Sequence, residues 1–185
     1  MASLTQLLQV RRATFADALR LSILGAHVFV DTYATDGIRE SIAHEITELL
    51  SREAFERHSV EPSTTMLVAE MNGHLVGYIH ASRGARHAAV AARLPVEIVR
   101  LYVQPRFAAH GIGSALLESV EAHERSASAD VVWLTAYSGN QRALDFYERR
   151  GYGDQGPVMY SFQGEDCENR LFVKPLVASG IATAR

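Results

Sequence analysis

The stretch Val96–Leu117, VEIVRLYVQPRFAAHGIGSALL, joins a strand pattern to a helix pattern through a run of small residues. Residues 97–103 alternate and are rich in Ile, Val, Leu and Tyr, which predicts a buried strand. Apolar residues then recur at helical spacing from Ile112 to Val120, so the period changes across Gly111. Backbone amides in such a loop, at the positive end of a helix dipole, bind phosphate oxygens. The stretch therefore predicts a phosphate or pyrophosphate site.

Two well-known phosphate loops do not fit this stretch. A dinucleotide-binding fingerprint needs a third glycine three residues after Gly113, where Leu116 stands. A nucleoside-triphosphate loop needs Gly-Lys-Ser/Thr at the helix start, whereas Gly113 is followed by Ser114 and no lysine is near. A plain corner, in which Gly111 and Gly113 only allow close packing, stays open because a pair of glycines is weak evidence alone.

A second motif, NQRALDFYERRGY, occupies residues 140–152 and follows an apolar strand pattern at residues 130–136. Asn140 is placed to cap a helix and Gly151 to end it. In their order and spacing the two motifs resemble the GNAT superfamily of acyl-coenzyme A-dependent N-acetyltransferases. The second motif of that family reads Asn-x-x-Ala-x-x-x-Tyr-x-x-x-Gly-Phe/Tyr. The match covers Val96–Tyr152.

The resemblance extends over most of the chain and implies a fold. Residues 10–18 look like the family's first strand and helix, with Thr14 and Asp17 at capping-box spacing. Asn72-Gly73, between two alternating apolar runs, predicts a hairpin independently of the family. We expect an α/β (α+β) domain with a mixed, mainly antiparallel twisted sheet flanked by helices. That sheet should be splayed between its fourth and fifth strands. The N-terminal helices and residues 167–176 resemble, more narrowly, a subgroup related to bacterial spermidine/spermine acetyltransferases.

Length and composition agree with one domain at residues 1–176, which the resemblance implies is an acyltransferase, and with a loosely held tail at residues 177–185. The 185 residues are 48% hydrophobic and contain no linker-like stretch or repeat. One cysteine, no signal peptide and no apolar run of about 18 residues predict a soluble cytoplasmic protein without a membrane partner. A net charge of −3 argues against nucleic acid, and the histidines lack metal-ligand spacing. We expect no metal, and a homodimer is left open.

The resemblance assigns the chemistry to two residues. Transfer of an acetyl group to a primary amine needs the neutral amine, yet an amine of pKa about 10.4 is almost wholly protonated at pH 7. Glu97 stands where family members carry a base, and Arg100 should share its face and hold it ionised. Tyr147 stands where the family places a general acid that donates to the departing thiolate. From the residues alone, Glu97 can equally be a strand-end charge and Tyr147 a core aromatic.

The same resemblance implies acetyl-CoA as co-substrate, bound along both motifs. Backbone groups of Leu101, Tyr102 and Val103 would pair with the pantetheine arm like an added strand. Asn140 would hydrogen bond the pantetheine or cap its helix. The pyrophosphate would lie on backbone amides of Ala108, Ala109, His110, Gly111, Ile112, Gly113 and Ser114. Arg106, His110 and Arg142 are the nearby candidates for a cation.

One departure bears on this interpretation. The family's loop usually begins with arginine or glutamine, whereas this chain has Ala108 there, and Ala109 where glycine is frequent. Because backbone N–H groups make most of the pyrophosphate hydrogen bonds, binding should survive. The alternative to an enzyme is a degenerate GNAT-fold module that binds acyl-CoA or regulates without catalysis.

The acceptor is expected to be a small-molecule amine or a peptide. Two charged segments of the sequence favour different kinds of acceptor. Acidic residues between positions 31 and 48 could attract a cationic amine such as a polyamine, although such residues usually form a solvated helix face. Basic residues between positions 83 and 94 could instead cover the acceptor cleft and favour an acidic substrate or peptide. The acidic residues are Asp31, Asp36, Glu40, Glu45 and Glu48, and the basic residues are Arg83, Arg86, His87 and Arg93.

Overall fold

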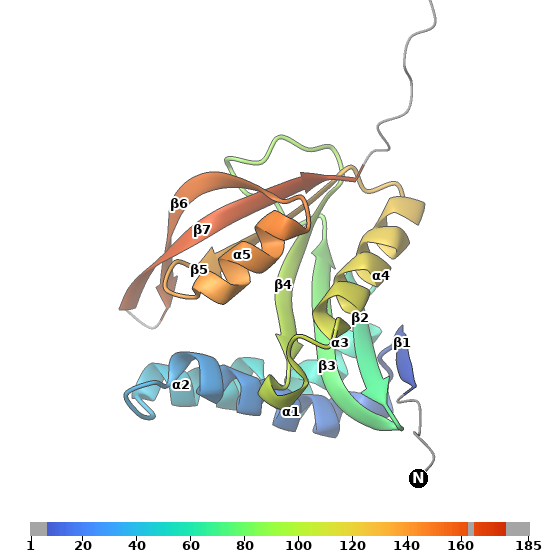
Figure 1. Cartoon of the computed structure of the whole chain (residues 1–185), viewed down its shortest axis with the longest axis vertical. Helices are drawn as coiled ribbons and strands as arrows, with labels where there is room; N and C mark the ends of the chain where they lie inside the picture. The colour runs from blue at the N-terminus through green and yellow to red at the C-terminus, as the bar shows by residue number, and fades with distance from the viewer. Residues whose placement is uncertain (1–6, 163–164, 177–185) are drawn as a thin grey trace, which may run out of the picture.

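The computed structural model describes residues 7–162 and 165–176, and these form a seven-stranded sheet with helices on both faces (Figure 1). The strands are β1 (Leu8–Arg12), β2 (Thr64–Met71), β3 (His74–Arg83), β4 (Pro95–Val103), β5 (Val131–Tyr137), β6 (Gly153–Phe162) and β7 (Glu165–Pro175). The helices are α1 (Ala18–Tyr33), α2 (Glu40–His44), α3 (Arg52–Val60), α4 (Ile112–Ser126) and α5 (Gln141–Arg149). Short turns are the 3-10 helices η1 (Phe15–Asp17) and η3 (Pro105–Phe107) and the π-helix η2 (Glu45–Leu49). The predicted tail at residues 177–185 lies outside the described residues.

The sheet opens between β4 and β5, its only parallel pair among the described strands. These two strands pair only over residues 95–97 and 131–133. Further on, β4 continues along β3 to Val103, while β5 continues along β7 to Tyr137. Figure 1 shows the two strands together at one end and diverging toward the other. The predicted sheet, mainly antiparallel and splayed between the fourth and fifth strands, is confirmed.

The predicted hairpin is also present, between β2 and β3. Met71 pairs with His74 across a two-residue turn, in which Asn72 has φ 53° and Gly73 has φ 79°. Two successive positive φ values are typical of the turn that suits the right-handed twist of paired strands. This hairpin brings β3 alongside β4 and so supports the strand that borders the opening.

Each face of the sheet has its own apolar core. On one face, α4 and α5 cover side chains such as Ile79, Val96 and Leu134. On the other, α1 and α3 cover Val68 and Tyr78. Alternation of side chains along each strand produces this division. The opening between β4 and β5 therefore connects two faces that the rest of the sheet keeps apart.

Two buried carboxylates hold α4 against the sheet. Glu124 accepts from Thr65 Oγ1 at 2.5 Å and from Arg83 Nε at 2.9 Å. Glu121 accepts from the Tyr152 hydroxyl at 2.9 Å and from Lys174 Nζ at 2.7 Å. Buried carboxylates with several partners resist displacement because moving them would leave a charge unpaired. These contacts fix the helix whose first turn faces the opening.

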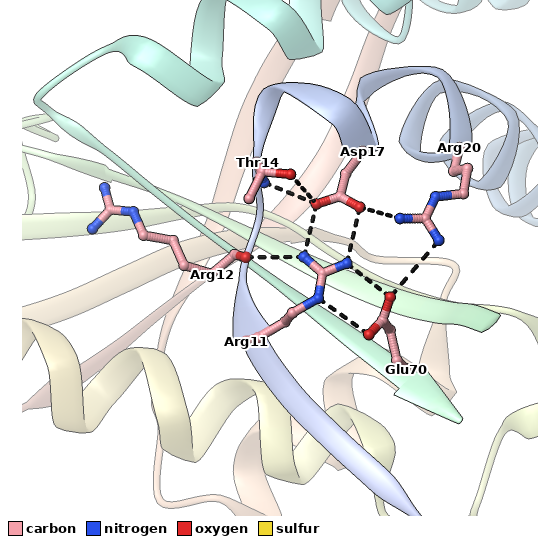
Figure 2. A network of polar contacts seen from close by, with 6 residues as sticks. All are labelled: Arg11, Arg12, Thr14, Asp17, Arg20 and Glu70. Atoms are coloured by element: carbon pink, nitrogen blue, oxygen red, sulfur yellow. Dashed lines mark hydrogen bonds and ion pairs between the residues drawn. The ribbon is translucent and has the colours of Figure 1, made fainter. Parts of the chain in front are cut away.

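A polar network ties α1 to the edge of the sheet, as Figure 2 shows. Asp17 is 1% exposed and accepts from Arg11 at 2.7 and 2.9 Å, from Thr14 and from Arg20. The same Arg11 guanidinium also binds Glu70 of β2. Thr14 and Asp17 form the capping box that the sequence predicts. The network thus joins β1, β2 and the start of α1.

We expect Asp17→Asn to lower the free energy of unfolding by about 3 kcal/mol, because two arginines would lose their buried carboxylate. Urea denaturation measures this. Hydrogen bonds from Arg11 hold the pKa of Asp17 well below its usual range. The contribution of Asp17 is therefore complete above its unfolded-state pKa of about 3.9 and is lost as the pH falls below it. Asp154→Asn, which breaks a pair with Arg170 nearer the surface, is the matched control. Equal losses in the two variants would contradict the special role of the network.

Candidate active site

The predicted phosphate loop lies where β4 leaves the sheet. After β4 the chain makes the turn η3, and α4 begins after Gly111, whose φ of +76° is left-handed. Ala109 is also left-handed, at φ 64°, a conformation that costs an alanine about 1 kcal/mol. Within the described chain, the first hydrogen bond of α4 runs from the Ala115 N–H to the Gly111 carbonyl at 3.0 Å. The amides that precede Ala115 in the first turn are therefore free to bind an anion.

Side chains around this loop leave its backbone accessible. His110 Nδ1 lies 2.8 Å from the Ala108 carbonyl oxygen, so its ring folds back on the loop. The side chain of Ile112 is buried in the core, and only its backbone could meet a ligand. Arg106 on η3 and Arg142 in the first turn of α5 are exposed. An anion here would meet backbone amides first, with exposed cations at the rim.

Arg150, at the end of α5, brings a further cation to the start of α4, and no motif of the sequence predicts it. Its Nη2 donates to Ser114 Oγ, and its guanidinium lies 5.6 Å from the centroid of the Phe146 ring. The four-residue spacing of Phe146 and Arg150 along the helix is the signal that could have revealed the pair. Through this contact, α5 and α4 are joined beside the loop.

The edge of β4 that faces the opening is the predicted platform for a pantetheine arm. Leu101 and Val103 pack against the α4 side of the sheet, while the Tyr102 ring lies 5.5 Å from Tyr78 on the other side. Beyond residue 97, this edge pairs with no strand that the structure describes. Its backbone groups are thus available to an extended ligand. Across the opening, Asn140 caps α5 by accepting from the Ala143 N–H at 3.1 Å, as its position in the sequence predicts.

Glu97 and Arg100 share one face of β4, although they are three residues apart. Strict alternation would put them on opposite faces. A bulge at Val99, between the pairs Ala81–Ile98 and His80–Arg100, restores them to the same face. Burial raises the pKa of Glu97 above its ordinary value, and the charge of Arg100 opposes this rise. Arg100 thus acts in the expected direction, but burial is the larger effect and the pKa of Glu97 is raised overall.

Tyr147 projects from α5 into the core beside the opening. Its ring centroid lies 5.6 Å from that of Tyr152 and 5.9 Å from that of Phe172, and the residue is 8% exposed. No hydrogen bond holds its hydroxyl within the described chain. Burial, and to a lesser degree the nearby Tyr33, raise the pKa of Tyr147 above its ordinary value. The phenol thus stays protonated near neutral pH, as a hydrogen-bond donor must.

The N-terminal helices reach both sides of the opening. At the end of α1, the Tyr33 ring lies 6.3 Å from Tyr137, the last residue of β5. From η2, Glu45 forms an ion pair with Arg100 of β4, and the two side chains are only 8% and 14% exposed. These contacts gather tyrosines and a largely buried ion pair on one face of the opening, called here the tyrosine-rich face. The other face carries α4, α5 and the loop.

Fewer charged side chains of the acidic and basic segments reach the tyrosine-rich face than the composition of these segments suggests. Arg83 binds Glu124 on the α4 side, and Arg86 binds carbonyl oxygens of its own loop. The His87 ring packs 5.3 Å from that of Trp133, whose β5 position neighbours Glu97. Of the acidic residues between positions 31 and 48, Glu45 is the buried one; Asp31, Asp36, Glu40 and Glu48 are exposed.

Comparison with known proteins gives this arrangement its context. The model of the acetyltransferase (GNAT) family matches residues 32–152, more than half of the chain. The chain belongs to this family. The GNAT chain is 28% identical over 161 residues to an uncharacterised N-acetyltransferase of Mycobacterium tuberculosis (strain ATCC 25618 / H37Rv), covering 87% of this chain and 99% of that one.

Two further relatives were identified. N-alpha-acetyltransferase 60 of Danio rerio is 33% identical over 115 residues, which cover 53% of this GNAT chain and 48% of the relative. The crystal structure of the PaiA N-acetyltransferase from Thermoplasma acidophilum, in complex with coenzyme A, superposes with a TM-score of 0.69 at 21% identity. It covers 89% of this chain and 98% of that one, and it shares the fold. The predicted family and GNAT-type N-acetyltransferase class are thus confirmed; the spermidine/spermine subgroup stays a prediction.

Two features of the described residues of this GNAT domain concern membranes and metals. None of its helices is both long and apolar enough to cross a membrane. Residues 7–162 and 165–176 also hold no group of three or more His, Cys, Asp or Glu that could bind a metal ion.

Proposed function

We propose that the protein transfers an acetyl group from acetyl-CoA directly to the primary amine of a small molecule or peptide. The observation that carries the proposal is the parting of β4 from β5 after three paired residues, beside the uncapped first turn of α4. The pantetheine arm would pair with Leu101–Val103, and the pyrophosphate would accept from the amides of residues 109–114. The amide of Ala108, which the sequence also assigned to the pyrophosphate, instead donates to the Pro105 carbonyl at 3.1 Å and closes the turn η3. Arg150 and Arg142 would add positive charge at the rim.

The two proposed catalytic residues lie on different faces of the opening and have different roles. Acetyl-CoA supplies the acetyl group as a thioester. Glu97, on the tyrosine-rich face, takes the proton that the ammonium acceptor must lose, directly or through water. The amine nitrogen then forms the new C–N bond as the C–S bond breaks. Tyr147 donates a hydrogen bond to the sulfur that leaves as thiolate. Because burial raises the pKa of Tyr147, full transfer of its proton is uphill, and hydrogen bonding is its main contribution.

A cationic amine suits the tyrosine-rich face better than an acidic acceptor. Glu97 brings a negative charge, and the Arg100 charge is paired with Glu45. Arg83 and Arg86 of the basic segment are held by other groups, Glu124 and a carbonyl oxygen of the loop, and so attract an acidic acceptor less strongly. Polyamines carry the required ammonium groups at neutral pH, and so in large part do peptides with a free N-terminus.

The test uses the full chain in two assays. Calorimetry with acetyl-CoA, NAD and ATP should give binding of acetyl-CoA alone. A panel of polyamines, aromatic amines and short peptides, with release of free thiol as the readout, should then reveal an acceptor. Binding of a nucleotide in place of acetyl-CoA would refute the proposal. Binding of acetyl-CoA without thiol release by any amine would favour the degenerate binding module.

The loop provides a more local prediction. Gly113→Val should weaken acetyl-CoA binding about tenfold or more, about 1.4 kcal/mol. A Cβ at this position would lie 3.5 Å from the Phe146 ring and 3.9 Å from Val103, so a valine extends into the opening. Gly111→Val should weaken binding too, with some loss of stability from its positive φ. Titration calorimetry and thermal melting separate the two effects.

Two alanine positions serve as controls for this prediction. Ala109→Gly places glycine at a left-handed residue, so it should retain acetyl-CoA binding. Ala108→Arg restores the side-chain donor usual in the family and should bind acetyl-CoA as well as the wild type or better. Unchanged affinity in a folded Gly113→Val protein would leave the glycines with a packing role only. A large loss in Ala108→Arg would mean that the ligand takes another path.

A further inference from the structure

The ion pair between Glu45 and Arg100 is a feature that the proposed chemistry does not yet use. It joins the π-helical turn η2 to the middle of β4, across 55 residues of sequence. Both side chains are largely withdrawn from water, with exposed fractions of 8% and 14%. Because of the bulge at Val99, Arg100 lies on the same face of β4 as Glu97. A charge pair is thus fixed on the tyrosine-rich face, and its arginine lies on the same face of β4 as the carboxylate proposed as base, on which its charge acts.

The other titratable groups around Arg100 are neutral near neutral pH. Burial lowers the pKa of His80 to about 3 and lowers that of His58, whose ring lies 4.7 Å from His80. Burial raises the pKa of the tyrosines of this face. These groups come from α1 (Tyr33), α3 (His58), β3 (Tyr78 and His80), β4 (Tyr102) and β6 (Tyr160). Arg100 and Glu45 are therefore the charged pair of this cluster, and Arg100 is the member whose charge lowers the pKa of Glu97.

We propose that the Glu45–Arg100 pair positions and tunes the base: Arg100 holds Glu97 ionised, and Glu45 limits the strength of that effect. This inference rests on the proposed function, in which Glu97 accepts the proton of the amine. A lone arginine would stabilise the carboxylate so well that it became a weak base. A site without any cation would leave a buried carboxyl protonated at neutral pH. The pair gives an intermediate state, in which Glu97 is ionised yet still basic.

The two halves of the pair should have opposite effects when removed. Arg100→Met takes away the charge that favours the carboxylate, so the acid limb of the kcat/KM profile should move to higher pH by about one unit. Glu45→Gln leaves the arginine without its counter-ion, so the acid limb should move to lower pH by about half a unit. A merely structural ion pair would give both variants the same defect. The direction of the shift is therefore the decisive readout.

The experiment records kcat/KM against pH for wild type and variants with the same amine, so that the amine's own ionisation is common to all profiles. Arg100→Lys, which keeps the positive charge, should restore the acid limb to the wild-type position even if Arg100→Met does not fold. Glu124→Gln is the matched control, because it breaks a buried ion pair with Arg83 on the opposite face of the sheet. Its acid limb should coincide with that of the wild type.

The outcomes distinguish failure of the tuning role from failure of the proposed function. Shifts of opposite sign for Arg100→Met and Glu45→Gln support the tuning role. Shifts of the same sign, or none, while Glu97→Gln abolishes the acid limb, would overturn the tuning role and leave Glu97 as the base. An acid limb that persists in Glu97→Gln and vanishes in Glu45→Gln would identify Glu45 as the base and overturn both assignments. Absence of acetyl transfer in the wild type would instead refute the proposed function.

Discussion

Glu97→Gln lowers the rate of acetyl transfer at pH 7 by about a hundredfold, and the rate recovers as the pH rises toward the pKa of the amine, about 10. The substitution removes proton acceptance while nearly preserving shape. Below the amine's pKa, almost all acceptor is ammonium and needs a base; above it, free amine is already present. The measurement is kcat/KM against pH for a fixed amine, with acetyl-CoA saturating.

Glu53→Gln is the control for the loss of one carboxylate, because Glu53 lies exposed in the first turn of α3. Its profile should follow that of the wild type. Burial already raises the pKa of Glu97, which brings the carboxyl closer to the working pH of a base. If the Glu97→Gln rate stays flat and near the wild-type value at every pH, Glu97 is not the base, and water or another residue takes the proton.

Tyr147→Phe should reduce kcat by about 10-fold to 10³-fold, with little change in acetyl-CoA affinity. Only the hydroxyl is removed, and its ring contacts with Tyr152 and Phe172 stay in place. Because no residue of the described chain hydrogen bonds to that hydroxyl, removing it leaves no buried polar group without its partner. Steady-state kinetics and titration calorimetry check both halves of the expectation.

Tyr152→Phe is the matched control, on the neighbouring ring. Its hydroxyl donates to Glu121 at 2.9 Å, so this variant should lose about 2 kcal/mol of folding stability. Acetyl transfer per folded molecule should be retained. The two variants thus separate an effect on acetyl transfer from an effect on folding stability. A Tyr147→Phe enzyme with wild-type kcat would assign that residue to the core and leave the thiolate to another donor.

Where local interactions decide the structure, sequence patterns were sufficient. The Asn72-Gly73 turn, the Thr14–Asp17 capping box and the Asn140 cap all form within a few residues. The change of period around Gly111 likewise located the loop between β4 and α4. Each depends on backbone conformations and hydrogen bonds available to a short segment. Family resemblance then predicted the splayed sheet, whose strand order no local pattern contains.

The predicted ends of strands and helices were less accurate, because residues distant in the sequence help to set them. The strand pattern at residues 130–136 corresponds to β5 at Val131–Tyr137, because Asp130 instead accepts from the N–H groups of Arg93 and Leu94, each at 2.8 Å. Those donors come from a loop 36 and 37 residues earlier in the chain. The partner of Arg83 was out of reach of sequence patterns for the same reason, since this residue binds Glu124 of α4, 41 residues further along the chain.

By itself, then, the sequence determined the turns, the caps, the place of the loop between β4 and α4 and, through two spaced motifs, the family. Only the tertiary structure decided which charges meet. Glu45 and Arg100 pair across 55 residues, Arg150 reaches Ser114 across 36, and a bulge at Val99 turns Arg100 to the face of Glu97. Such partners follow no period along the chain, because a buried charge is stabilised by whichever opposite charge the packing of helices on the sheet brings within reach.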